Sequence, residues 1–195
     1  MQLGGYTRNV RDLLEFANAA DPASPDTFFR RNLPRVGLYD SAGDTGQVAL
    51  ATGVMTSVPV FLRAGDLITN VNVRSGATAA NGPTNQWAAL YSSAGTPALL
   101  AQSTDRTTEA WAANTTRTFA LATPQRIAAD GLYYVGLMVA ASTAVPTLLG
   151  SVAAPAIVTG ERALSQSSGS SLTGSAPNTI ASTTAKQFVP YVVLT

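Results

Sequence analysis

The chain contains no cysteine and no histidine, and each absence limits its chemistry. Without cysteine there is no disulfide and no thiolate metal site. Without histidine the chain lacks the usual general base near neutral pH, the Ser-His-Asp and Cys-His catalytic arrangements and imidazole metal ligands. Most hydrolase mechanisms are therefore excluded, and carboxylate chemistry is what remains.

Charged residues are also scarce, at 12% of the 195 residues, against roughly 25% in an ordinary soluble domain. Serine, threonine, alanine, asparagine and glycine take their place. Because such a surface has little self-repulsion, it favours a subunit covered by neighbours in a permanent assembly; the alternative is a neutral, loop-rich monomer. The net charge of +1, with arginines scattered singly, predicts no nucleic-acid partner.

Long apolar runs are missing as well. No stretch approaches the roughly 20 apolar residues of a membrane span, and the first residues lack the apolar centre of a signal peptide. We therefore expect no membrane span, and assembly in the cytoplasm of the cell that makes the protein.

The 11 acidic residues form no recognisable catalytic or metal-binding pattern. A glycosidase would need two carboxyl groups on one cleft, and a calcium loop needs acids at closer spacing. Several acids stand where turn chemistry alone would place them, namely Asp40, Asp44, Asp66, Asp105, Glu109 and Asp130. We predict no enzyme, no cofactor and no metal, with a carboxylate-pair glycosidase as the catalytic alternative.

Residues 1–35 differ from the rest, because they carry nine of the 23 charged residues. Val10, Leu13 and Leu14 fall on one stripe of a short helix, which ends at Asp21-Pro22. A helix of about 12 residues is marginal alone in water, so the stripe must be buried against something. We predict that residues 1–35 are a docking arm; the alternative is a helix folded back on its own domain. The expected docking residues are Val10, Leu13, Leu14, Phe16, Phe28, Phe29, Arg30 and Arg31, the two arginines pairing with carboxylates of a partner.

Residues 36–195 consist of short apolar runs separated by turn residues, the pattern of an antiparallel sandwich or barrel. We predict an all-β domain, an antiparallel β-sandwich of jelly-roll type. The turn at 63–66 is expected to join 58–62 and 67–73 in a hairpin, and 86–91 to pair with 98–101. Residues 159–187 are rich in Ser, Thr, Gly and Ala, and are either a flexible lobe or an ordered arm lying across another chain.

The run 132–140 is apolar on both faces, so it is either central in the sandwich or covered by a neighbouring subunit. Together with the low charge content, it predicts a homo-oligomer, with a trimer as the expected form. Residues 188–194 are expected to close the chain as one strand. The predicted core positions are Val71, Val73, Trp87, Leu90, Leu132 and Val135.

The two tryptophans could stack on sugars, since an aromatic ring binds a glycan by flat apolar contact. Trp87 lies within an apolar strand and is predicted to be core. Trp111 has loop-like flanks, which leave exposed and buried positions both open. If a ligand patch exists, Trp111 with Asn114 and Asp105 is the candidate.

The region from Phe61 to Leu149 carries several distinctive segments. They are Leu62–Asp66, Ile68–Val71, Ser75–Ala80, Pro83–Tyr91, Leu99–Gln102, Trp111–Thr115 and Gly131–Gly136. This region resembles a module of phages of actinobacteria that is usually labelled a minor tail, tail-fibre or head-fibre protein. None of these segments is catalytic, and here only a short arm precedes the module.

The resemblance implies a jelly-roll-like receptor-binding or decoration domain that is often trimeric. We accordingly expect a structural virion protein of a tailed bacteriophage, a minor tail, fibre or capsid decoration subunit that contacts other virion proteins and could also contact a host-surface glycan. Tail and capsid positions both stay open. The alternative is a glycan-binding module without a structural role.

Overall fold

The computed structural model describes residues 30–32, 50–152, 159 and 163–195. These residues form β-strands and loops, with no helix among them, and every paired strand runs antiparallel to its neighbour. The strands are β1 (Met55–Leu62), β2 (Leu67–Arg74), β3 (Asn81–Tyr91), β4 (Leu99–Gln102), β5 (Thr116–Arg126), β6 (Gly131–Ala144), β7 (Gly150–Val152), β8 (Gln166–Ser168), β9 (Thr184–Ala185), β10 (Phe188–Pro190) and β11 (Val192–Leu194).

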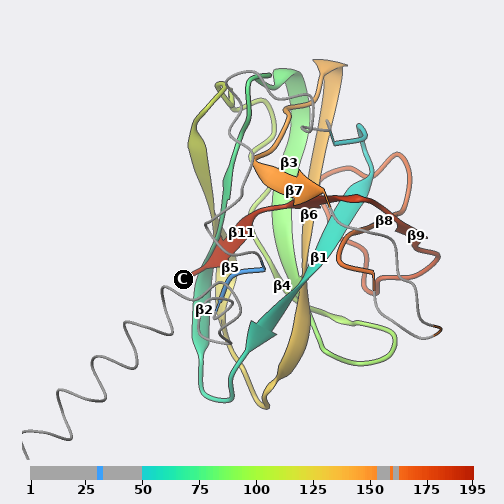
Figure 1. Cartoon of the computed structure of the whole chain (residues 1–195). Helices are drawn as coiled ribbons and strands as arrows, with labels where there is room; N and C mark the ends of the chain where they lie inside the picture. Colours follow the sequence, from blue (N-terminus) through green and yellow to red (C-terminus); the bar gives the residue numbers. More distant parts are fainter. Residues whose placement is uncertain (1–29, 33–49, 153–158, 160–162) are drawn as a thin grey trace, which may run out of the picture.

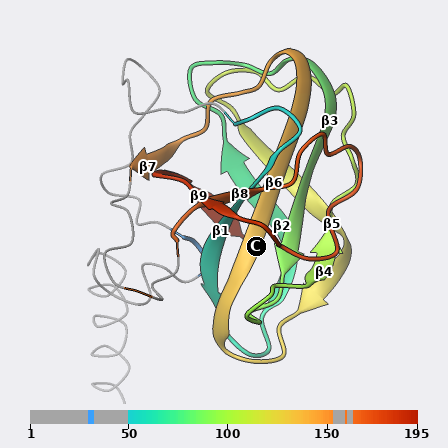
Figure 2. The same ribbon diagram turned by 90° about the vertical axis from the view of Figure 1, so that its right-hand side faces the viewer.

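The larger sheet has six strands in the order β4-β3-β6-β1-β8-β9, and the facing sheet has three in the order β11-β2-β5. A short two-stranded sheet, β10-β7, lies beside them. Figure 1 and Figure 2 show the two larger sheets as layers. The predicted all-β, antiparallel fold is confirmed for the part of the chain described, and the layers are those expected of a β-sandwich.

The main core lies between the two sheets, and period-two alternation builds it. On β1 the side chains of Val58, Val60 and Leu62 point inward, while on β5 Phe119 and Leu121 do so. Successive strand residues face opposite sides of a sheet, so these apolar positions form one continuous inner surface.

A second apolar cluster covers the outer face of the six-stranded sheet, and residues 169–183, the loop between β8 and β9, form a lid over it. Trp87 and Tyr91 on β3 are fully buried there, beneath the loop residues Ala176 and Ile180. The Trp87 indole donates a hydrogen bond to the carbonyl of Thr173 at 2.6 Å. The Ser/Thr-rich run therefore lies, where described, across its own sheet rather than across another chain.

The lid explains why residues 132–140 are apolar on both faces. β6 is central in the sheet, between β3 and β1, with Val135 in the main core and Met138 in the outer cluster. Both faces of the strand are buried inside one chain. β6 therefore gives no reason to expect a neighbouring subunit.

Two details of strand arrangement differ from the sequence-based expectation. β1 and β2 do not form a hairpin, because β1 belongs to the six-stranded sheet and β2 to the three-stranded one. The turn 63–66 instead carries the chain from one sheet to the other, with Gly65 at a positive φ of 89°. The expected last strand is two strands, β10 and β11, which change sheets at Tyr191.

The core prediction holds for Val71, Val73, Trp87, Leu90 and Val135, all of which are buried. It is wrong for Leu132, which is 43% exposed. Leu132 begins β6 and pairs with the exposed Phe61 on the sheet's outer face. Alternation places Leu132 outward there, and the neighbouring Phe61 stays open to solvent instead of covering it.

Residues 30–32 pair with the outer edge of β11 and lengthen the three-stranded sheet. The amide of Leu194 donates to the carbonyl of Arg30 at 2.7 Å, and the Arg31 backbone bridges Val193. The Asn32 side chain accepts a hydrogen bond from the Val192 amide at 2.8 Å. We call residues 30–32 the edge latch, because they cap backbone groups that an open strand edge would leave unpaired. The expected helix, the docking residues up to Phe29 and the boundary at residue 35 lie outside the described residues.

Candidate functional site

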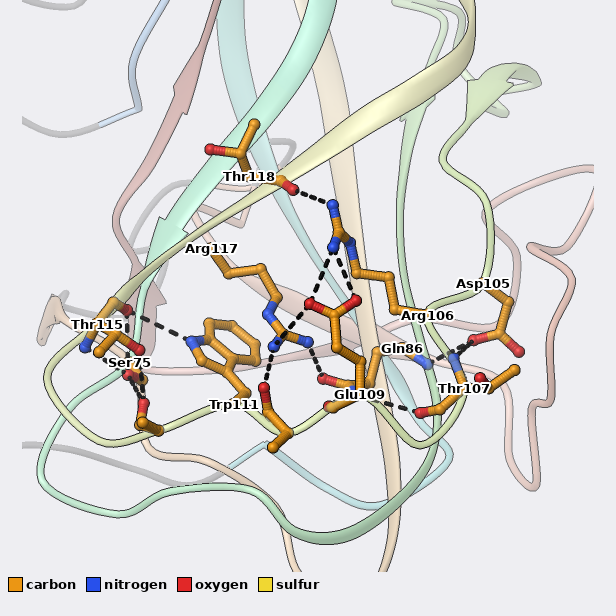
Figure 3. A network of polar contacts seen from close by, with 12 residues as sticks. Ser75, Gln86, Asp105, Arg106, Thr107, Glu109, Trp111, Thr115, Arg117 and Thr118 are labelled. Carbon is orange, nitrogen blue, oxygen red and sulfur yellow. Dashed lines mark hydrogen bonds and ion pairs between the residues drawn. The ribbon is translucent and has the colours of Figure 1, made fainter.

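The predicted ligand patch falls in the long connection from β4 to β5, which crosses between the sheets. Figure 3 shows the polar network at this position, and its centre is Arg117 on β5. The Arg117 side chain is only 7% exposed. It donates to the Gln86 side-chain oxygen at 2.7 Å and to the carbonyl of Ala110. Its guanidinium also lies over the Trp111 ring, 5.1 Å from the ring centre.

Glu109 supplies the counter-charge of this network. Both of its carboxylate oxygens accept from Arg106, at 3.0 and 2.8 Å, and one lies 3.5 Å from Arg117. Burial lowers the pKa of Arg117, and the attraction of Glu109 opposes that shift, whereas the charge of Arg106 adds to it. Because a guanidinium keeps its proton in proteins, Arg117 remains a buried cation.

Arg106 fastens the connection to the three-stranded sheet. It donates to the Thr118 carbonyl at 2.8 Å, and its guanidinium lies 5.9 Å from the centre of the Phe119 ring. A bidentate arginine–carboxylate pair holds both partners in a fixed orientation. Arg106, Glu109 and Arg117 thus act together to hold the loop in one shape.

Asp105, the acid of the predicted patch, is occupied in a turn. It accepts hydrogen bonds from the amide of Gln86 at 2.7 Å, the amide of Thr107 at 2.9 Å and the side chain of Asn85 at 2.5 Å. Three donors on one carboxylate are what a structural turn acid makes. Asp105 and Glu109 therefore both bind groups of the loop and its neighbouring strands.

Trp111 is buried, which settles the position left open by the sequence. Its ring is 2% exposed and stands edge-on to Phe119, with ring centres 6.0 Å apart and planes at 77°. Asn114 is exposed and its backbone lies in the left-handed region, at a φ of 56°. Its backbone amide donates a hydrogen bond to the carbonyl of Gly76. Of the three predicted patch residues, only Asn114 is exposed, and the Trp111 face cannot stack on a sugar.

An open depression of about 400 Å³ lies beside this network. Arg106, Glu109 and Arg117 are its charged lining residues, and Thr115, Thr116 and Thr118 also line it. The Thr115 hydroxyl donates to the carbonyl of Ala112 and the Thr118 hydroxyl to the side-chain oxygen of Asn72. Hydroxyl groups and a neutralised ion pair suit hydrogen bonding to an uncharged polar ligand.

Sequence reasoning missed Arg117 and Gln86, although a signal was present. Arg117 alternates in phase with Phe119 and Leu121, both of which point into the core. That phase predicts an inward arginine, which needs buried acceptors. Gln86 provides one, and its own amide group donates to the carbonyls of Thr107 and Glu109.

Of the predicted docking residues, the structure describes Arg30 and Arg31. The Arg30 guanidinium donates to the Asp66 carboxylate of its own chain at 2.9 Å, and its pairing with a carboxylate of a partner stays a prediction. Arg31 lies against β11 through its backbone. The latch therefore joins the segment before residue 30 to the β-domain at a fixed point.

The described ranges contain no group of three or more acidic residues close enough to hold a metal ion. They also contain no helix long and apolar enough to cross a membrane. No protein-family model matches the chain, and no curated protein matches it.

Proposed function

We propose that this protein is a structural, non-catalytic virion subunit of a tailed bacteriophage, a minor tail, fibre or capsid decoration protein. The observation that carries the proposal is how the ionisable groups of the candidate site are used. Arg117, Arg106, Glu109 and Asp105 all hold the loop in place, and the histidine-free chain leaves no base beside a nucleophile. The low charge content and the resemblance over 61–149 support the same conclusion.

We infer the finer architecture on the same basis. Consecutive strands repeatedly change sheets, as β1 and β2 do, and so do β5 and β6, which favours a jelly-roll type of sandwich. A homotrimer is proposed from the sparse surface charge alone, since β6 is buried within its own chain. The protein would act in the virion, after assembly in the host cytoplasm.

In this proposal the segment 1–29 attaches the subunit to a neighbouring virion protein. The edge latch supports a division at residue 30, because Arg30, Arg31 and Asn32 belong to the sheet edge while the predicted helix precedes them. The attachment function and the stability of the β-domain should then be separable.

The experiment deletes residues 1–29 and leaves the latch in place. We expect the melting temperature to stay within about 2 °C of the full chain, because every described contact remains, and incorporation into particles to fall at least tenfold. Asn32→Ala in the full chain is the control, since it should lower the melting temperature while keeping segment 1–29. Normal incorporation of the shortened chain, or the absence of the intact protein from purified particles, would contradict the proposal.

The open depression favours a second candidate, glycan binding at the 103–118 loop, since Thr115, Thr116 and Thr118 line it. A glycan array probed with the wild type and with Thr116→Val tests it directly. Binding that is lost with the hydroxyl group would make recognition of a host-surface sugar the function of this loop.

A further inference from the structure

The domain has two chemically different ends. At one end the turns 63–66 and 127–130 lie together, and we call this the corner end. The amide of Gly65 donates to the carbonyl of Ile127, and the amide of Ala64 donates to Asp130 at 2.7 Å. The opposite loop end contains 75–80, 103–115 and 145–149, joined by the bridges Ala80–Trp111 and Ser75–Leu148. Figure 1 and Figure 2 both show the two turns of the corner end side by side.

Residue 30, where the edge latch begins, lies at the corner end. Residues 30–32 run antiparallel to β11, with Arg30 opposite Leu194 and Asn32 opposite Val192. Arg30 also binds Asp66, the last residue of the first corner turn. The direction of the latch therefore places the junction with segment 1–29 next to this corner.

The corner end also carries exposed apolar side chains. Phe61, 37% exposed, and Leu132, 43% exposed, are direct partners across β1 and β6. Leu67, 43% exposed, lies just beyond the same turn, on the other sheet. At the loop end Trp111 and Leu148 are buried, and Val152 on β7, which is 54% exposed, pairs with the partly buried Phe188 and has no exposed apolar strand partner. Paired exposed apolar side chains on a protein with so polar a surface mark an interaction site.

We propose that the corner end, through Phe61 and Leu132, is the face that docks on the particle, against an apolar surface of the same virion protein that receives segment 1–29. The inference rests on the proposed function and adds the orientation of the subunit. The junction with segment 1–29 and the apolar pair lie at one end, so one partner can engage both, and linking two contacts raises the affinity of each. The loop end, with its threonine-lined depression, then points away from the particle.

The first test compares Phe61→Ser/Leu132→Ser with Val152→Ser. Val152 is a matched control, because it is 54% exposed but lies on β7, which joins the loop-end half through Leu148 and Leu149. We expect the double variant to keep the melting temperature of the wild type and to fall at least fivefold in incorporation, with the control unchanged. If the double variant is incorporated normally while the chain lacking residues 1–29 is not, the docking face is overturned and the proposed function still stands.

A second measurement tests the orientation of the subunit while Phe61 and Leu132 stay unchanged. The chain has no cysteine, so Ala64→Cys at the corner end and Ala112→Cys at the loop end each place one thiol on an exposed position. In intact particles a maleimide reagent should label the Ala112→Cys variant readily and the Ala64→Cys variant at least tenfold more slowly, whereas both variants react alike as free proteins. The reverse pattern, or equal labelling in particles, would refute the orientation.

Two other occupants of the apolar pair give distinct results. If a second copy of this chain covers it, native mass analysis of the free protein will show an oligomer that the double variant dissociates. If segment 1–29 of the same chain covers it, the deletion alone and the double variant alone will each lower the melting temperature by the same amount. Combining the two changes will then lower it no further. Either result overturns the proposal. Absence of the intact protein from purified particles would instead remove the proposed function itself.

Discussion

Trp87 is the side chain on which the outer face of the sandwich depends most directly. It is fully buried on β3, opposite Met138, and its indole donates a hydrogen bond to the carbonyl of Thr173 in the lid formed by residues 169–183. Replacing it with alanine removes one of the largest side chains from a packed site. Such truncations cost roughly 3–5 kcal/mol, because apolar burial is lost and a cavity is left.

The hydrogen bond and the ring can be measured separately. Trp87→Phe keeps most of the apolar volume but removes the donor to the carbonyl of Thr173. Because Thr173 is exposed and water can replace that donor, the loss costs about 0.5–1.5 kcal/mol. We therefore expect alanine to cost at least twice as much as phenylalanine. Since domains of this size are stable by roughly 5–15 kcal/mol, the alanine variant should lose between about a fifth and all of its free energy of unfolding.

The assay is urea unfolding at equilibrium, followed by circular dichroism, together with limited proteolysis of the lid. In Trp87→Ala the lid should be cleaved faster than in the wild type, because its buried anchor is gone. A variant that unfolds within 1 kcal/mol of the wild type, with an equally resistant lid, would refute the view that Trp87 holds this layer together.

Three further outcomes follow from named contacts. Arg117→Met should cost about 2–4 kcal/mol in urea unfolding, because it leaves the buried Gln86 oxygen unpaired; an unchanged midpoint would mean that the cation is dispensable. Asn32→Ala should cost about 1–2 kcal/mol by the same assay, since it uncaps the β11 edge, and Arg31→Ala, which keeps the backbone bridge, should cost less. Burial raises the pKa of Tyr91 above its ordinary value of about 10, so its contribution to stability is complete below pH 10 and is lost as the pH rises further, when the unfolded chain ionises first. The decline of the melting temperature above pH 10 should be less steep in Tyr91→Phe, and identical slopes would refute this assignment.

Strand positions were predictable because alternation is a local property. The runs around Val58, Trp87 and Val135 were recognised as strands, and the pairing of 86–91 with 98–101 is confirmed as β3 with β4. Partner strands were less predictable. The turn at 63–66 was compatible with a hairpin, yet β1 pairs with β6 and β2 with β5, since a short turn can join neighbours in one sheet or cross between two.

The candidate site was located only approximately. The sequence directed attention to the loop containing Asp105, Trp111 and Asn114, but the structure turns the Trp111 ring into the core and occupies Asp105 with three donors. Arg117, which organises the loop, was not identified. Its role depends on Gln86, which lies 31 residues earlier in the chain, and such a pairing leaves no trace in local spacing.

The sequence by itself determined the class of structure and the limits on chemistry. Composition excludes histidine and thiolate mechanisms, and period-two alternation with frequent turns specifies an antiparallel β-protein. Tertiary structure alone decided what covers each strand. The sequence of β6 is apolar on both faces whether its outer face is covered by its own chain or by a neighbouring subunit. Only the folded chain shows that residues 169–183 cover this outer face, so no neighbouring subunit is needed to bury it. Local sequence fixes which face a side chain occupies, whereas the partner across that face is chosen by packing between segments far apart in the chain.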